Sequence, residues 1–120
     1  MRKDPFEILE QAVQNRKSVE IINHGKKQTT RRTICPHILG TKQNGTMQVL
    51  GYHLSGESST KETIDPNDVR LAFRLMNIEN IEIVQANDGR LFLDEWKTVP
   101  GYLAYWSPSF ETVHAFVPDD

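Results

Sequence analysis

The sequence contains only one cysteine, Cys35, in 120 residues. A single thiol excludes an internal disulfide framework and any structural metal site built from cysteines. No stretch approaches the roughly 18 consecutive apolar residues that indicate a membrane-spanning helix. Residues 1–15 carry acidic side chains and lack the apolar segment of a secretory signal. We therefore expect a cytoplasmic protein with no membrane partner.

Patterns typical of a catalytic or cofactor-binding site are also absent. The histidines are scattered, and no pair has the spacing of metal ligands within one element. Neither glycine-rich phosphate-binding fingerprint occurs. Cys35 and His37 share a face of an extended segment, but Pro36 between them orients neither and no third group is visible. The sequence thus predicts a non-enzymatic protein without metal or cofactor, in which Cys35 serves packing.

Length and composition indicate one globular domain spanning residues 1–120. The mass of 13.8 kDa is that of an ordinary single domain. Hydrophobic residues make up 38% of the chain and charged residues 25%. These proportions are usual for soluble globular proteins and argue against intrinsic disorder.

The net charge of −2 conceals an uneven distribution. Residues 1–45 hold nine Lys/Arg against four Asp/Glu, a balance of +5, whereas residues 46–120 hold five against twelve, a balance of −7. A basic first third can present a positive patch to phosphate groups. The alternative is that these are ordinary solvated charges, because the pI of about 6.1 is far below that of a dedicated nucleic-acid binder.

The chain begins with a helix signal. Asp4 suits the cap position and Pro5 the first helical position. Phe6, Leu9 and Val13 then follow at helical spacing on one face. The pattern predicts a helix over about residues 5–15.

From residue 18 the apolar period changes from 3.6 to 2, which indicates strands. Asn44-Gly45 marks a hairpin, and Pro36 indicates an edge position or a bulge. Residues 55–69 form the longest loop. The predicted strands cover about residues 18–23, 29–39, 47–54 and 70–75, with a fifth reached through a short turn within 78–84. A small, highly curved, partly open barrel over about 18–84 would hide the edges of such strands, giving a mainly β (α+β) fold.

The C-terminal extension, residues 85–120, has a different character. Residues 87–89 indicate a turn, 90–96 and 101–106 are strands or irregular, and 107–114 indicate a short helix. Half of the ten aromatic residues fall within fifteen positions. They are Trp96, Tyr102, Tyr105, Trp106 and Phe110. These side chains either cover the open end of the barrel, or form a stacking surface for bases or a dimer contact.

Five segments in a characteristic order give the chain a resemblance to a known family. They read ILEQA (8–12), VEI (19–21), RRTICPHIL (31–39), LGY (50–52) and FRLMNIENI (73–81). In this order and spacing, residues 8–84 resemble a WYL domain. The resemblance implies a small SH3-like or Sm-like five-stranded barrel with a helix before it. It covers about two thirds of the chain and leaves residues 85–120 without a counterpart.

The chain departs from the family pattern at three places. Met47-Gln48-Val49 stands where the family has Trp-Tyr-Leu, Asn23 replaces a usual tyrosine and Asn77 a usual arginine. Family members are mostly prokaryotic ligand sensors in transcriptional regulators, often behind a helix-turn-helix, and some accompany CRISPR systems. Because only one helix precedes the barrel here, the resemblance implies a stand-alone module whose partner is nucleic acid or a nucleotide-derived ligand.

Basic side chains and two aromatic rings form the predicted binding site. The guanidinium group matches phosphate geometry through paired hydrogen bonds, and the resemblance brings the strands of Arg32 and Arg74 near one another. Tyr52 or His37 would stack on a base. The basic candidates are Lys26, Lys27, Arg31, Arg32, Lys42 and Arg74. The alternative is that these side chains are ordinary surface charges, which water solvates on the exterior of the barrel.

The sequence therefore predicts a non-enzymatic regulatory or accessory module that binds single-stranded nucleic acid or a nucleotide-like anion. A second hypothesis is a protein–protein module whose aromatic C-terminal region forms a homodimer or docks onto a larger partner. A third is a small enzyme with a cryptic site, for which no catalytic constellation is visible.

Overall fold

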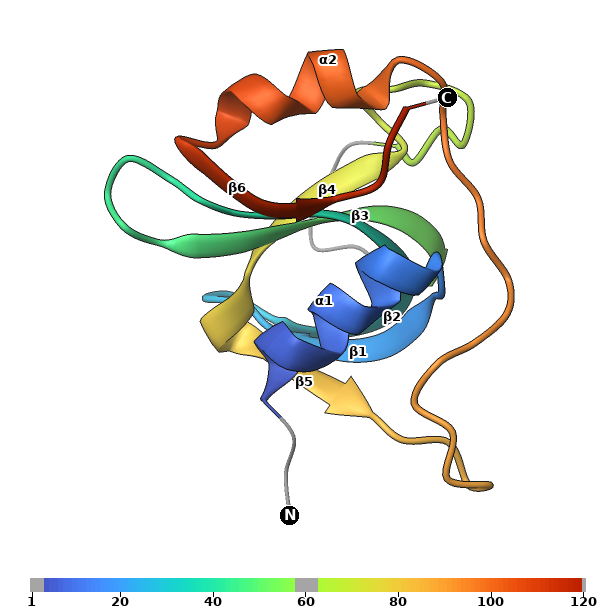
Figure 1. Ribbon diagram of the computed structural model, residues 1–120. Coiled ribbons are helices and arrows are strands. Elements are labelled where there is room, and N and C mark those ends of the chain that lie inside the picture. Colours follow the sequence, from blue (N-terminus) through green and yellow to red (C-terminus); the bar gives the residue numbers. More distant parts are fainter. Residues whose placement is uncertain (1–3, 58–62, 120) are drawn as a thin grey trace.

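The structure is a computed structural model that describes residues 4–57 and 63–119. Within these ranges a helix is followed by an antiparallel sheet and a short C-terminal helix (Figure 1), which confirms the predicted mainly β, α+β class. The strands are β1 (Val19–His24), β2 (Thr29–Thr41), β3 (Met47–Gly56), β4 (Phe73–Asn77), β5 (Ile81–Val84) and β6 (Thr112–Phe116). The helical segments are α1 (Pro5–Asn15), α2 (Tyr102–Trp106) and the 3-10 turns η1 (Ile78–Asn80) and η2 (Ser107–Ser109). Of the described helices, none has the length and apolar character needed to cross a membrane.

Helix α1 begins and ends where the sequence predicts. Asp4 Oδ1 accepts a hydrogen bond of 3.0 Å from the backbone N–H of Phe6, and Pro5 occupies the first helical position. Arg16 takes a left-handed conformation with φ of 52°, and its N–H bonds back to the last turn, which ends the helix. The helix packs on β2 through its apolar face. The buried residues of this face are Ile8, Leu9, Ala12 and Val13.

The central strand is β2, which has two neighbours along one of its edges. The strand order is β4-β3-β2-β1-β5, and β6 also pairs with β2. Pairing with β1 reaches Ile34, and pairing with β6 begins at Ile38, so β2 changes its neighbour around Pro36. The register with β3 shifts between Pro36 and Ile38, which confirms the bulge predicted at the proline.

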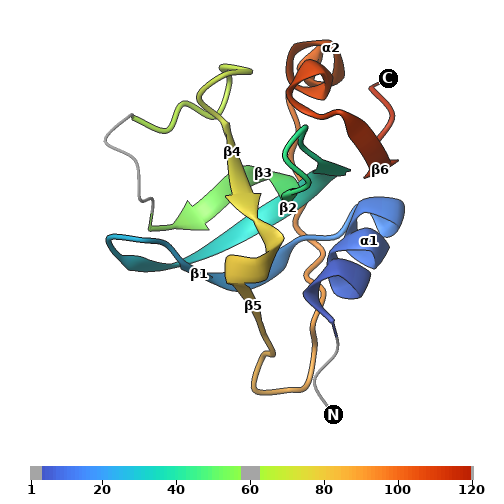
Figure 2. The same cartoon turned by 90° about the vertical axis from the view of Figure 1, so that its left-hand side faces the viewer.

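The sheet is not closed into a barrel within the described residues, so the predicted five-stranded barrel is wrong in this respect. The two ends of the main strand order, β4 and β5, are not hydrogen-bonded to each other. Only η1 separates Asn77, the last residue of β4, from Ile81, the first of β5 (Figure 2). This short connection brings the two ends of the curved sheet near each other. A closed barrel would also require backbone hydrogen bonds between β4 and β5.

The strand predicted over residues 70–75 begins later, because β4 spans Phe73–Asn77. Asp68 explains the shift. Its Oδ1 accepts hydrogen bonds from the backbone N–H of Arg70 at 2.8 Å and of Leu71 at 3.2 Å, which holds the preceding chain in a turn. Of the predicted loop 55–69, residues 58–62 lie outside the described ranges.

The helix predicted from residue 107 to about His114 is also wrong. Only the single turn η2 forms there, and His114 lies in β6 instead. His114 Nε2 is 2.6 Å from Thr41 Oγ1, so the side chain joins β6 to its neighbour β2. Tertiary pairing with a long central strand outweighs the local Ser-Pro helix signal.

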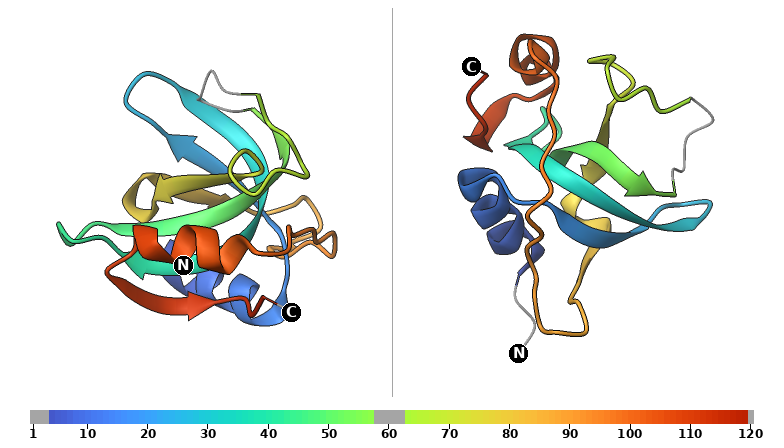
Figure 3. Two further views of the ribbon diagram at one scale, coloured as in Figure 1. Left: turned by 90° about the horizontal axis from the view of Figure 1, so that it is seen from above. Right: turned by 90° about the vertical axis from the view of Figure 1, so that its right-hand side faces the viewer.

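The C-terminal extension covers one end of the sheet, as one of the two alternatives expects. Residues 85–100 connect the end of β5 to α2 (Figure 3), with the predicted turn at 87–89 and a bridge between Ser18 and Leu93. Tyr102 is buried, and its hydroxyl donates to the carbonyl of Val117. Trp106 Nε1 donates to the carbonyl of Val69 at 2.7 Å. These contacts use the aromatic side chains to extend the core.

Candidate functional site

Three cationic or titratable side chains meet on one face of the sheet. His53 on β3 lies opposite Ile34 on β2, and Arg32 is two residues from Ile34 on that same strand. Arg74 on β4 lies opposite Gly51, two residues from His53. Because residues two apart in a strand share a face, Arg32, His53 and Arg74 point to the same side. We call these three residues the buried cation cluster.

Arg32 is the most enclosed member of the buried cation cluster, with only 2% of its surface exposed. One guanidinium nitrogen, Nη2, donates to Thr30 Oγ1 at 2.6 Å, while Nε has no hydrogen-bond partner. Within residues 4–57 and 63–119, no carboxylate forms an ion pair with it. Burial, reinforced by the charge of Arg74, lowers the pKa of Arg32.

Arg74 and His53 complete the cluster from the neighbouring strands. Arg74 is 8% exposed, and its Nη1 donates to the carbonyls of Leu71 and Phe73. His53 is 7% exposed, with Nε2 3.1 Å from the carbonyl of Gly56 and Nδ1 without a partner. Burial lowers the pKa of His53, and the charges of Arg32 and Arg74 lower it further. The two guanidinium groups are therefore close enough to act on the imidazole together.

The other predicted basic residues do not join this cluster. Arg31 points to the opposite face of β2, where its side chain is exposed and forms an ion pair with Glu20. Lys26 and Lys27 lie exposed in the β1–β2 turn, at the end of β2 that carries Arg32. Lys42 lies exposed in the β2–β3 turn at the other end of that strand. The predicted basic residues thus lie at four places on the molecule, of which the buried cation cluster holds only Arg32 and Arg74.

The two rings expected to stack on a base are both inside the protein. His37 has no exposed surface and Tyr52 is 3% exposed. Tyr52 packs against Phe73 with ring centroids 5.6 Å apart, and its hydroxyl donates to the carbonyl of Pro66. His37 is enclosed by rings of the sheet and of the C-terminal extension. Neither ring offers a face to a ligand in this arrangement.

Cys35 is also buried, and burial raises the pKa of its thiol to about 11. A thiol that stays protonated at neutral pH is a poor nucleophile, so the geometry offers no support for Cys35 in catalysis. In the part of the chain that the structure describes, no group of His, Cys, Asp or Glu side chains is placed to hold a metal ion.

Sequence reasoning missed His53 and Thr30. In the sequence, His53 is an isolated histidine within a mostly apolar strand. It shares a face of the sheet with Arg74 because it is two residues from Gly51, which lies opposite Arg74, and that pairing cannot be read from the sequence. Its position opposite Ile34 depends on a register shift between Thr33 and Ile34. Such a shift arises from pairing between strands and leaves no signal in either strand alone.

Comparisons of this chain with protein-family models, with curated proteins and with solved structures found no match.

Proposed function

We propose that this chain is a non-enzymatic binding module for a phosphate-bearing ligand of nucleotide-like chemistry, with Arg32 and Arg74 as the groups that hold the phosphate. The observation that carries the proposal is Arg32, a guanidinium group that is 2% exposed, with Nε unsatisfied and with no ion pair to a described carboxylate. The resemblance of residues 8–84 to WYL domains points to the same ligand class.

An isolated buried charge is strongly unfavourable unless it is paired. An unsatisfied buried N–H group adds a further desolvation cost of about 1–3 kcal/mol. A bound anion removes both penalties at Arg32, because a phosphate oxygen accepts from Nε and neutralises the charge. His53 lies beside the same anion, but its Nε2 donates to the carbonyl of Gly56, so Nδ1 of the neutral ring is an acceptor and would donate to the anion only after the imidazole takes up a proton.

The depth of the cluster favours a compact anion over a long polymer. A nucleic-acid backbone is usually bound by exposed cations spread along a surface. Here the two arginines are 2% and 8% exposed, so a ligand reaches them only when the surrounding residues open locally, and a small terminal phosphate group needs less opening than a polymer backbone. Lys26 and Lys27, exposed at the same end of β2, supply long-range attraction for such a ligand. A nucleotide, or the phosphorylated end of a single strand, is the ligand class that meets both conditions.

The direct test is a titration of the ¹⁵N-labelled protein with adenosine monophosphate, followed by NMR. We expect the amide signals of Arg32, His53 and Arg74 to shift with the monophosphate and to stay in place with adenosine. Arg32→Met should weaken binding by about tenfold or more, because a hydrogen bond to a charged group is lost. The matched control is Arg31→Met, one residue away on the opposite face, which should leave the affinity within about twofold.

Short single strands with and without a 5′ phosphate, measured at low and moderate salt, separate a nucleotide from a polymer ligand. Binding that is steeply salt-dependent and indifferent to the 5′ phosphate would instead indicate the backbone as ligand. The proposal fails if millimolar monophosphate leaves the spectrum unchanged, or if Arg31→Met and Arg32→Met weaken binding equally.

A second candidate function is self-association through the C-terminal region. Large apolar side chains are exposed there, with Tyr105 at 47% and Phe116 at 48%. Light scattering over a range of concentrations tests this, with Phe116→Ser as the comparison because its side chain is not needed for the core. A mass that stays monomeric at every concentration would contradict self-association.

A further inference from the structure

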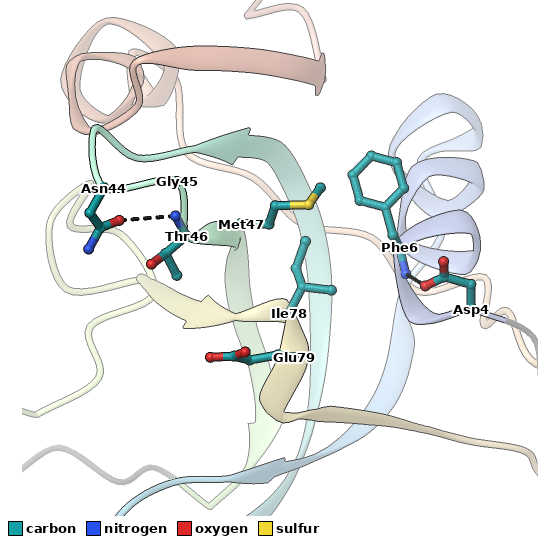
Figure 4. A pocket seen from close by; sticks show the side chains of 8 residues that line it. All are labelled: Asp4, Phe6, Asn44, Gly45, Thr46, Met47, Ile78 and Glu79. Atoms are coloured by element: carbon teal, nitrogen blue, oxygen red, sulfur yellow. Dashed lines mark hydrogen bonds between the residues drawn. The ribbon is translucent and has the colours of Figure 1, made fainter.

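Two grooves lie next to each other at the N-terminal end of helix α1, and Asp4 and Glu79 line both of them. The first has a volume of about 600 Å³ and lies between the helix, the β2–β3 turn and η1 (Figure 4). The second has a volume of about 740 Å³ and follows η1 and β5. Because the grooves share these two residues, they adjoin each other, and we call the pair of grooves the Asp4–Glu79 trough.

Apolar residues contribute about half of the lining of the trough on both sides of Asp4 and Glu79. In the first groove, Figure 4 shows Met47 and Ile78 on one side and Phe6 of the helix on the other. Met47 is 38% exposed and is one of the large apolar side chains that the described residues leave at the surface. The apolar residues of the second groove include Ile8, Ile81, Ile83 and Leu91. Exposed apolar surface of this kind in a groove is typical of a binding site.

The charges along the trough are of one sign. Its ionised residues are Asp4, Glu79 and Glu82, and within residues 4–57 and 63–119 no lysine or arginine lines either groove. Glu79 has no hydrogen-bond or ion-pair partner among these residues, and the Asp4 carboxylate accepts one hydrogen bond, from the backbone N–H of Phe6. His24 lies 4.0 Å from Glu82 at the far end. Among the residues that the structure describes, the lining of the trough therefore carries a negative charge that no lysine or arginine offsets.

We propose that the Asp4–Glu79 trough binds an extended peptide segment of a partner protein in which a lysine or arginine is flanked by apolar residues. The cation would lie between the two carboxylates where the grooves adjoin, and the flanking apolar side chains would cover the apolar lining residues on either side. In an extended segment, side chains on one face recur every second residue, so alternate positions reach successive parts of the trough. This site is separate from the buried cation cluster, which selects ligands of the opposite charge.

Both parts of the interaction are needed. Exposed ion pairs contribute little by themselves because water and salt screen them. Apolar burial supplies the larger part of the affinity, and the carboxylates select the sign of the partner's charge. A peptide that lacks either property should therefore bind much more weakly.

The test uses three acetylated and amidated heptapeptides with ¹⁵N-labelled protein: one alternating leucine and lysine, one alternating leucine and glutamate, and one alternating serine and lysine. We expect only the leucine–lysine peptide to shift the amide signals of residues that line the trough, such as Phe6, Met47 and Glu79. The proposal is overturned if this peptide causes no shifts, if the serine–lysine peptide binds as well, or if the shifts lie elsewhere.

A charge-reversal pair sharpens the test. Glu79→Lys should weaken binding of the leucine–lysine peptide by about five- to tenfold, because an attraction becomes a repulsion. The matched control is Glu95→Lys, which reverses an exposed charge that does not line the trough. Equal weakening by both variants would show that only net charge matters and would overturn the assignment. Arg32→Met should leave peptide binding unchanged.

Discussion

The imidazole ring of His37 stacks on the indole of Trp96, with ring centroids 4.7 Å apart and planes 16° from parallel. His37 Nδ1 lies 2.7 Å from the carbonyl of Cys35, which can only accept, so Nδ1 carries the proton. Nε2, 2.8 Å from Thr98 Oγ1, then accepts from the hydroxyl. The neutral His37 on β2 thus connects the sheet to the C-terminal extension through its contacts with Trp96 and Thr98.

This arrangement predicts that the protein loses stability in mild acid. Burial lowers the pKa of His37 from 6.5 to about 4. The unfolded chain therefore takes up a proton between these two values that the folded protein excludes, so stability is fully present above pH 6.5 and decreases as the pH falls toward 4. The expected decrease in the free energy of unfolding due to His37 is about 3 kcal/mol at pH 4. Urea unfolding at a series of pH values measures it.

His53 contributes in the same pH range, so a variant isolates His37. Burial also lowers the pKa of His53 from 6.5, whereas the lowered pKa values of Asp88 and Asp94 affect stability only below their ordinary value of 3.8. His37→Gln cannot titrate and should show a shallower pH dependence between pH 6.5 and 4. Identical slopes for the two proteins would show that His37 is not responsible.

Removal of the buried charge should stabilise the unliganded protein. Arg32→Met keeps much of the side-chain volume and removes a charge that lies inside the protein with one hydrogen bond. We expect the free energy of unfolding to rise by about 1–2 kcal/mol, because no buried ion pair is broken by the change. Urea unfolding without phosphate measures this. A loss of stability would indicate that the guanidinium group is already satisfied.

Gly40 allows β6 to approach β2 closely. A Cβ atom at this position would overlap with Phe110 and would lie 2.7 Å from the carbonyl oxygen of Thr112. Gly40→Ala should therefore lower the free energy of unfolding by about 1–3 kcal/mol and loosen the C-terminal extension. Gly45→Asn is the control, because Gly45 has open space around it and asparagine tolerates its φ of +86°. Equal thermal stability of the two variants would contradict the prediction.

Cys35 should be unreactive in the folded protein. Its side chain is fully buried, and burial raises the pKa of the thiol to about 11. A thiol reagent such as dithionitrobenzoate at pH 8 should react at least about 100-fold more slowly with the native protein than with the protein in guanidinium chloride. A similar rate in both conditions would place the thiol at the surface.

Local sequence signals predict the elements whose cause is local. The cap at Asp4 and the apolar spacing after it define helix α1, and Asn44-Gly45 defines the β2–β3 turn, where Gly45 has φ of +86°. These signals fail where distant residues decide the structure. The side chain of Asp68 delays β4, and pairing with β2 converts the chain around His114 into strand β6.

The candidate site was predictable in part. Arg32 and Arg74 are expected to meet because the order of the segments resembles a WYL domain, and the strand register brings them to one face. The exposure of each side chain was not predictable, because alternation along a strand does not say which face is buried. Arg31 and Arg32 are adjacent in the sequence, yet one is exposed beside Glu20 and the other is enclosed.

The sequence alone determined the α+β class, helix α1 and most of the strands, and it limited Pro36 to an edge position or a bulge, because capping, side-chain periodicity and turn chemistry act over a few residues. Only the tertiary structure decided that the sheet stays open between β4 and β5, that β6 joins β2, and that His53 lies with Arg32 and Arg74. These features depend on register and pairing between strands far apart in the chain. The interactions that stabilise these features form between strand faces that meet only after the chain has folded.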